Sequence, residues 1–408
     1  MSFRFRPPAV ALTPELRWVL LRAFAAGSAA VPAAVDLAEA ARLAARLGLA
    51  ARIGSRARPA AELAGAPEAA AELARASRVA AVAMLQATEA AGEIASAAGA
   101  AGASCCFLKG VALELSGALA PGSRVLGDVD VLVPEGAASA VVDALVARGY
   151  APCAGEEYPH HLPPLLHPRL GLVEVHRHLP GISVSGLVSV SGPGGRSFAT
   201  FEALAAAGLL VRSPQPGRAA WLPSPPVLVA HALAHALLQH GFRPDAYPTV
   251  RLLGDLVDLG SGGPEGEALL AASSALLDER ATASEARAAL DACRALVAGE
   301  IDWIAEDTPA ALLVRHLIAG ALDTRYGEAL KLRDLVRPLH EGRRWAGWWN
   351  AGRQALALSD AQLERVYGKP RSRWGYVGRR LLRPLDLLWR AGRAVRSSIG
   401  TRRGRRVS

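Results

Sequence analysis

Two aspartates lie two residues apart in the stretch GDVDVLV, residues 127–133. The alternating valines predict a buried strand, and side chains two residues apart on a strand point the same way, so Asp128 and Asp130 share one face. Like charges on one face of a core strand are costly unless a cation pairs them. The pair therefore predicts a site for a divalent metal ion, with phosphates beyond it.

A lysine and a glycine precede this pair, at a turn expected between a short strand and a short helix. Gly110 lets the backbone approach a ligand closely, and the following helix N-terminus with Lys109 attracts anions. Arg124, four residues before Asp128, is a second candidate phosphate ligand, the alternative being a salt bridge to one of the aspartates. Lys109, Gly110 and Arg124 are therefore the predicted nucleotide-binding residues.

A third carboxylate follows in the strand-like segment VEVHRHL, residues 173–179. Glu174 and His176 share one face of that strand. If it lies beside the first strand, three carboxylates converge, a ligand set that suits Mg²⁺ or Mn²⁺. Such ions stabilise the attacking and leaving oxygens in phosphoryl or nucleotidyl transfer. Asp128, Asp130 and Glu174 are thus the predicted metal ligands and catalytic residues.

Further histidines lie near this region of the sequence. His231 and His235 are one turn apart on an expected helix, and the segment HALAH lacks the glutamate of a zinc-hydrolase H-E-x-x-H motif. Two histidines at this spacing could hold a metal, but a place in the core or in a substrate pocket is favoured. His176, a further candidate for the pocket, either orients a ligand or serves packing. His160 and His161 lie in a proline-rich segment and are expected to be exposed.

The elements that must position these residues follow an alternating pattern. Residues 105–180 predict the order β-α-β-α-loop-β. The segments on either side are rich in alanine and leucine at helical spacing, whereas residues 181–223 are rich in Gly, Ser and Pro and indicate loops with a short helix. The predicted fold class is α+β, with a small mixed-sheet core flanked by mainly helical regions.

Five regions are predicted along the chain. They are an N-terminal helical region (1–100), the α/β core (101–180), a loop and helical region packing on the core (181–265), a C-terminal helical region (266–368) and a basic tail (369–408).

The net charge of +9 is concentrated at the C-terminal end, where residues 369–408 carry +12 and the remainder −3. This tail has three interpretations: a solvated end, a segment that binds an anionic membrane surface, or one that binds nucleic acid or an acidic partner. No specific nucleic acid is predicted as a partner. The four cysteines form neither a C-x-x-C motif nor a disulfide framework, and the N-terminus does not resemble a signal peptide, so a cytoplasmic protein is expected, with peripheral membrane contact through the tail.

The order of these motifs resembles a known family. FLKGVAL, RVLGDVDVLV, ALVARGY, VEVHRHL, HALAHALLQH and RLLGDLVDL together resemble the bacterial uncharacterised nucleotidyltransferase family, within the polymerase-β-like superfamily, over roughly residues 13–260. The resemblance implies a nucleotidyltransferase core with Asp128 and Asp130 as metal ligands, Glu174 as third carboxylate, and Lys109-Gly110 at the triphosphate-binding turn. The superfamily commonly has G-[G/S] at this turn, where this chain has K-G.

The resemblance implies a metal-dependent nucleotidyltransferase. The expected reaction moves a nucleoside monophosphate, with AMP favoured, from a nucleoside triphosphate to an unidentified hydroxyl or phosphate on a small molecule, peptide or protein. One alternative is a D-x-D glycosyltransferase, although its fold needs several β-α units before the motif and here about 100 residues of helix precede it. A second alternative is a non-catalytic module that binds a nucleotide or a partner protein.

Overall fold

The computed structural model describes residues 7–26, 34–56, 63–153, 160–184, 190–191, 197–214, 220–236, 249–260, 262, 265–277, 283–323, 326, 363, 370, 372 and 374–383. The chain divides into two units, Met1–Leu322 and Asp323–Ser408. None of the described helices has the length and apolar character needed to cross a membrane. The helices predicted between residues 327 and 360 lie outside the described residues.

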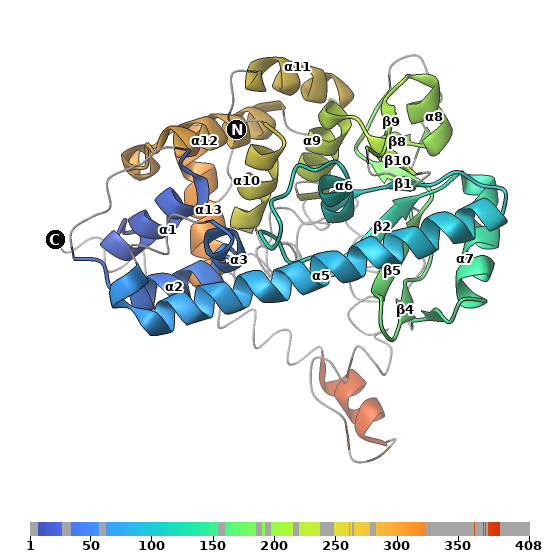
Figure 1. The fold of residues 1–408 in the computed structure, drawn as a ribbon, viewed down its shortest axis with the longest axis horizontal. Coiled ribbons are helices and arrows are strands. Elements are labelled where there is room, and N and C mark those ends of the chain that lie inside the picture. The colour runs from blue at the N-terminus through green and yellow to red at the C-terminus, as the bar shows by residue number, and fades with distance from the viewer. Residues whose placement is uncertain are drawn as a thin grey trace. The chain divides into compact units, whose positions relative to one another are not determined.

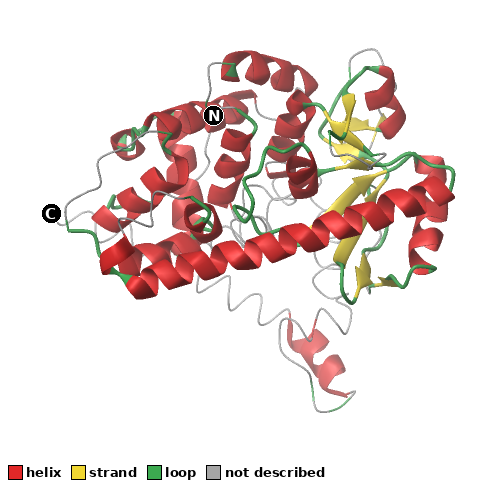
Figure 2. Ribbon diagram, in the orientation of Figure 1, coloured by secondary structure: helices red, strands yellow, loops and turns green. Residues whose placement is uncertain are grey.

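Seven strands of the described chain form a mixed sheet in the first unit (Figures 1 and 2). Their order is β3 (Ala151–Pro152), β4 (Leu165–His167), β5 (Gly171–His176), β2 (Asp128–Leu132), β1 (Cys106–Phe107), β10 (Trp221–Pro223) and β9 (Leu210–Arg212). The central strands β2 and β5 are parallel, and β1 is antiparallel to β2. This sheet and the helices around it confirm the predicted α+β class with a mixed-sheet core.

The sheet structure extends beyond residue 180, where the sequence indicated loops. A small second sheet has the order β6 (Leu179–Pro180), β8 (Ser197–Ala199) and β7 (Val190–Ser191). After helix α8 (Phe201–Ala206), β9 and β10 join the main sheet, with β10 parallel to β1. Strands of two or three residues are too short to show an alternating pattern, so their pairing with other strands decides their structure.

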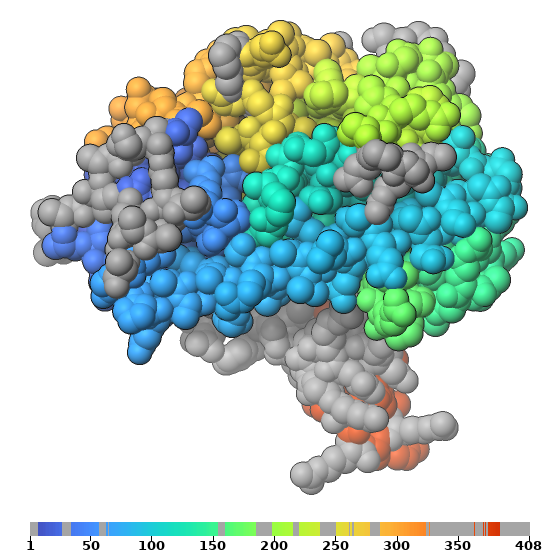
Figure 3. Space-filling view, in the orientation of Figure 1, coloured from blue at the N-terminus to red at the C-terminus, as the bar shows by residue number. Residues whose placement is uncertain are grey.

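Helix α5 (Pro67–Ala100) is 34 residues long, roughly 51 Å at 1.5 Å per residue. In Figure 1 it runs along the first unit, and its outer side crosses the face drawn in Figure 3. Leu73 near its start is buried in a helical core, whereas its second half, from Met84 to Ala98, packs in the core of the sheet. Helices α6 (Lys109–Leu115) and α7 (Ala138–Val146) also contribute to that sheet core.

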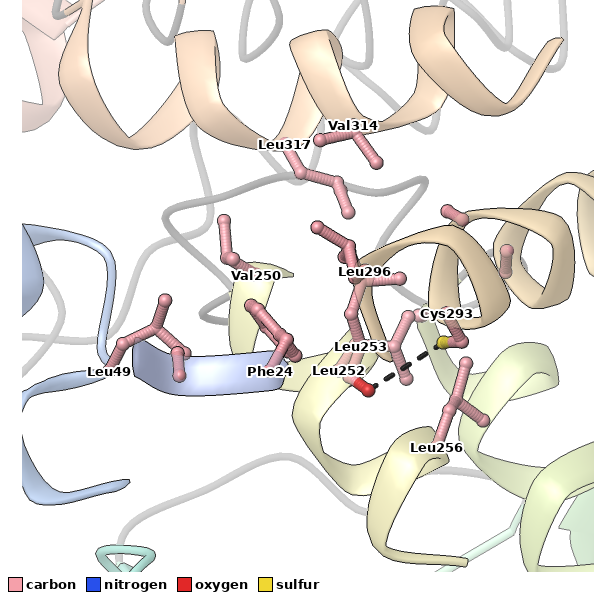
Figure 4. Packing of buried hydrophobic residues seen from close by; sticks show 14 of the residues in the cluster. Phe24, Leu49, Val250, Leu252, Leu253, Leu256, Cys293, Leu296, Val314 and Leu317 are labelled. Atoms are coloured by element: carbon pink, nitrogen blue, oxygen red, sulfur yellow. Dashed lines mark hydrogen bonds between the residues drawn. The ribbon is translucent and has the colours of Figure 1, made fainter. Parts of the chain in front are cut away.

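Helices from both ends of the first unit share the other core. They are α1 (Pro14–Phe24), α2 (Leu37–Arg46), α3 (Ala50–Gly54), α9 (Pro225–Ala234), α10 (Thr249–Asp258), α11 (Gly266–Leu276), α12 (Ala283–Ala298) and α13 (Pro309–Leu322). Figure 4 shows Phe24 of α1, Leu253 of α10 and Leu296 of α12 in one cluster of buried side chains. The helical regions predicted before and after the sheet therefore pack together through their apolar faces, and α9 also contacts β10 of the sheet.

Candidate functional site

Strands β2 and β5 bring Asp128, Asp130 and Glu174 to one face of the sheet. In the parallel register Asp130 is the direct partner of Glu174, and Asp128 is the partner of Leu172. Paired residues on neighbouring strands point to the same side, so the Asp130 and Glu174 side chains are neighbours. The two strands therefore lie side by side, which is the arrangement that the convergence of the three carboxylates requires. Repulsion from Asp130 is the main reason that the pKa of Asp128 is raised.

Three side chains on this face could hold a metal ion. Asp130, Glu174 and His176 each offer a ligand atom, and these atoms lie within 4.8 Å of one another. Asp130 and His176 are buried, whereas Glu174 is half-buried. Asp128 is exposed at the start of β2 and lies outside this group. Two carboxylates and an imidazole are ligands that divalent ions accept. Of the three predicted pocket histidines, His176 is the one that belongs to this group of described residues.

The Asp130 carboxylate has two close cationic or hydrogen-bonding partners. Lys109 Nζ donates to its Oδ1 at 2.7 Å, and His176 Nε2 lies 2.8 Å from the same oxygen. Burial alone would raise the pKa of Asp130, but the Lys109 ammonium and the hydrogen bond with His176 hold it well below its usual range. These contacts balance the charge that the sequence places on a core strand.

The same interactions change the pKa values of Lys109 and His176, the partners of Asp130. Burial disfavours the Lys109 ammonium, but attraction to Asp130, Asp128 and Glu174 outweighs it and raises the pKa of the lysine. Burial likewise opposes the His176 imidazolium, and its interactions with Asp130 and Glu174 raise the pKa of His176. The carboxylates of the site are therefore balanced by the Lys109 ammonium and by the His176 imidazole, whose protonated forms they stabilise.

The backbone of Lys109 is in the left-handed region, with φ of 50°. Glycine is the residue that adopts this conformation without steric cost, and a side chain there costs on the order of 1–2 kcal/mol. The K-G turn therefore places a strained lysine where its ammonium reaches Asp130. Strain of this kind persists when surrounding contacts hold the residue in place, and it concentrates at functional sites.

Arg124 lies directly over Gly110. A Cβ atom at Gly110 would come within 1.9 Å of Arg124 Nη1 and 2.6 Å of Leu126 Cδ2. Arg124 also forms a buried, two-point ion pair with Asp255 of α10, with Nε to Oδ1 at 2.8 Å and Nη2 to Oδ2 at 3.0 Å. The close approach that Gly110 permits is thus made by an arginine side chain, whose carboxylate partner is Asp255.

A small cavity of about 20 Å³ lies beside Lys109, large enough for one water molecule. His231 Nε2 is buried and has no hydrogen-bond partner among the described residues. Burial, with Lys109 second, lowers the pKa of His231 to about 3, so the ring is neutral near pH 7. The cavity is lined by Lys109, Leu113, Arg124, Leu228, His231, Ala232, His235, Asp255 and Leu259. The predicted pocket residues His231 and His235 therefore lie beside Lys109.

The expectation that both His160 and His161 are exposed is wrong. His161 is buried and forms an isolated bridge with His176, and Leu162 N donates to Val175 O at 2.9 Å. The His161 and His176 ring centroids are 5.3 Å apart. The prolines that follow indicate a loop locally, but this segment pairs with the end of β5, and that long-range pairing leaves no local pattern in the sequence.

Residues 33–265 match the model of a protein family described as "Uncharacterised nucleotidyltransferase". The match covers more than half of the 408-residue chain and includes every residue of the site described above. Comparisons with curated proteins and with solved structures gave no significant match. The chain therefore belongs to the uncharacterised nucleotidyltransferase family.

Proposed function

We propose that this protein transfers a nucleoside monophosphate, with AMP as the expected nucleotide, from a nucleoside triphosphate to a hydroxyl or phosphate acceptor. An acceptor oxygen attacks the α-phosphorus, the bond to the bridging oxygen breaks, and pyrophosphate leaves. The observation that carries the proposal is the in-register pair of Asp130 and Glu174, with Asp128 on the same face of β2. Family membership supports the reaction class.

The side chains fit a divalent ion, Mg²⁺ or Mn²⁺. The fit rests on the ligand atoms of Asp130, Glu174 and His176, which approach within 4.8 Å of one another, and on the nearby carboxylate of Asp128 as a further predicted ligand. A bound divalent ion would stabilise negative charge on the phosphate oxygens. Carboxylate oxygens suit Mg²⁺ and Mn²⁺ alike, so Asp130 and Glu174 are the main ligands for either ion.

Glu174 is the candidate for activating the acceptor. It is half-buried, whereas its partner Asp130 is buried and tied to Lys109 and His176. A carboxylate that remains accessible can accept the proton of an attacking hydroxyl. Lys109 is the candidate phosphate ligand, since its ammonium already lies at the carboxylates and stays protonated.

We assign Arg124 a positioning role beneath the nucleotide turn. Its guanidinium is buried, paired at two points with Asp255, and packed against Gly110. From there it holds the Lys109-Gly110 turn against α10 and thereby orients Lys109 towards Asp130.

Thermal-shift measurements with ATP, GTP, CTP and UTP, each with and without Mg²⁺ or Mn²⁺, test this function. The comparison includes wild type, Glu174→Gln in the site and Glu68→Gln on the exposed start of α5 as a control. We expect a metal-dependent stabilisation by one nucleotide that Glu174→Gln loses and Glu68→Gln keeps. Release of pyrophosphate from that nucleotide then serves as the assay in a search for the acceptor.

Two other outcomes would overturn the proposal. If no nucleotide stabilises the folded protein with either metal, the protein is instead interpreted as a non-catalytic binding module. Nucleotide sugars are included as further ligands. If they alone produce the metal-dependent shift, the protein is instead interpreted as a D-x-D glycosyltransferase.

A further inference from the structure

The described helix of the second unit, residues 374–383, has its apolar side exposed. Trp374, Val377 and Leu381 follow the i, i+3, i+7 spacing of one helix face, and Leu382 lies beside them. Trp374 is 81% exposed, Leu381 72% and Leu382 62%. This patch, Trp374, Val377, Leu381 and Leu382, places four large apolar side chains at the surface within ten residues.

The opposite side of the same helix is polar and less exposed. Tyr376, Arg379, Arg380 and Arg383 lie there and are half-buried. A helix that only packs on a soluble protein has the reverse arrangement, with apolar residues inward and charges outward. The inverted arrangement therefore indicates a surface that meets an apolar environment outside the chain.

The charge of the surrounding sequence indicates which environment that is. Thirteen of the residues from Lys369 to Ser408 are lysine or arginine, and one, Asp386, is acidic, giving a net charge of +12. A basic segment is attracted to the negative surface of an anionic bilayer, where each cation contributes about 1 kcal/mol. Tryptophan and leucine on one side of such a helix insert at the boundary between headgroups and acyl chains.

We propose that the patch binds the surface of an anionic membrane, with helix 374–383 lying in the interface and the basic segment 369–408 drawn to the lipid headgroups. The apolar side chains supply the insertion, and the net charge selects anionic over zwitterionic lipid. Nucleic acid would use the same charge but would not require the exposed leucines. This surface is independent of the nucleotidyltransferase proposal.

Vesicle flotation with the full-length protein tests the inference. The vesicles are phosphatidylcholine alone or phosphatidylcholine mixed with phosphatidylglycerol, and the variants are Leu381→Ser and Leu85→Ser. Leu85 of α5 is a matched control because it is 70% exposed, almost as much as Leu381. Both substitutions are at the surface, and circular dichroism verifies that each variant is folded.

We expect wild type and Leu85→Ser to float with the anionic vesicles only, less so at high salt, and Leu381→Ser to bind about tenfold more weakly because one inserted side chain is lost. Failure of wild type to float with anionic vesicles would overturn the proposal. So would equal binding by wild type and Leu381→Ser, particularly if both also bind a nucleic-acid duplex, since the interaction would then depend on charge alone.

Discussion

Arg124 and Asp255 are 131 residues apart in the chain and form a buried ion pair through two hydrogen bonds of 2.8 and 3.0 Å. Arg124 precedes strand β2, which carries Asp128 and Asp130, and Asp255 belongs to α10 of the helical core. Because Arg124 also lies against Gly110, the pair connects the turn that carries Lys109 and Gly110 to helix α10 of the helical core. A residue predicted to bind phosphate thus has a protein carboxylate as its partner.

Replacing Asp255 with alanine is expected to destabilise the protein by about 3–5 kcal/mol, because it leaves the Arg124 guanidinium buried without its carboxylate. The matched control is Asp302→Ala, which removes the partner of Arg17 in a surface ion pair where Asp302 is 84% exposed. That change is expected to cost less than about 1 kcal/mol. Denaturant unfolding measures both, and similar losses for the two variants would contradict a buried role for the Arg124–Asp255 pair.

A methyl group at Gly110 is expected to displace Arg124. Because Arg124 is held by Asp255 and cannot swing away freely, Gly110→Ala should cost about 1–3 kcal/mol, the usual range for overpacking. Gly92→Ala in the interior of α5 is the control, since nothing lies within 4 Å of the new Cβ. There the better helix propensity of alanine should leave stability unchanged or raise it by up to about 1 kcal/mol. If the two unfolding free energies change alike, the contact between Gly110 and Arg124 is not restrictive.

Two substitutions at Lys109 separate its charge from its backbone strain. Both Lys109→Ala and Lys109→Gly remove the ammonium from Asp130, but only glycine adopts the φ of 50° without cost. We expect the glycine variant to be more stable than the alanine variant by about 1 kcal/mol, despite the usual entropic penalty of glycine in a helix. Urea denaturation of the two variants measures the difference. An alanine variant that is the more stable of the two would show that the strain is relieved in solution.

His231 is expected to make stability fall in acid. Its pKa is about 3 in the folded protein against 6.5 for an unperturbed histidine, so between these pH values the unfolded state binds one more proton. The free energy of unfolding should therefore decrease as pH falls from 6.5 towards 3, by at most about 1.4 kcal/mol per pH unit from this residue.

His231→Gln removes the titrating imidazole. Between pH 6.5 and the acid limit of folding, the free energy of unfolding of the variant should therefore depend less on pH than that of wild type, by this amount. Above pH 6.5 the difference between the two free energies of unfolding should stay constant. Chemical denaturation at a series of pH values measures both curves. Parallel curves for wild type and variant throughout the range would mean that His231 titrates normally in the folded protein.

Much of the fold and part of the site could be predicted because they depend on local patterns. The strand of Asp128 and Asp130, the strand of Glu174 and His176 and the helix that begins at Lys109 are present where the sequence indicates them. Alternating valines and a lysine-glycine turn act over a few residues and can therefore be recognised in the sequence. The short strand β10 and the buried His161 could not be predicted from the sequence, because each depends on pairing with a distant segment.

The sequence by itself determined which side chains share a face of each strand, because alternation is a property of the extended backbone. Only the tertiary structure decided that Asp130 is paired with Glu174, that Lys109 and His176 balance its charge, and that Asp255 binds Arg124. These contacts join residues that lie far apart in the chain. Their partners are selected by how the sheet and helices pack, which no spacing within one segment encodes.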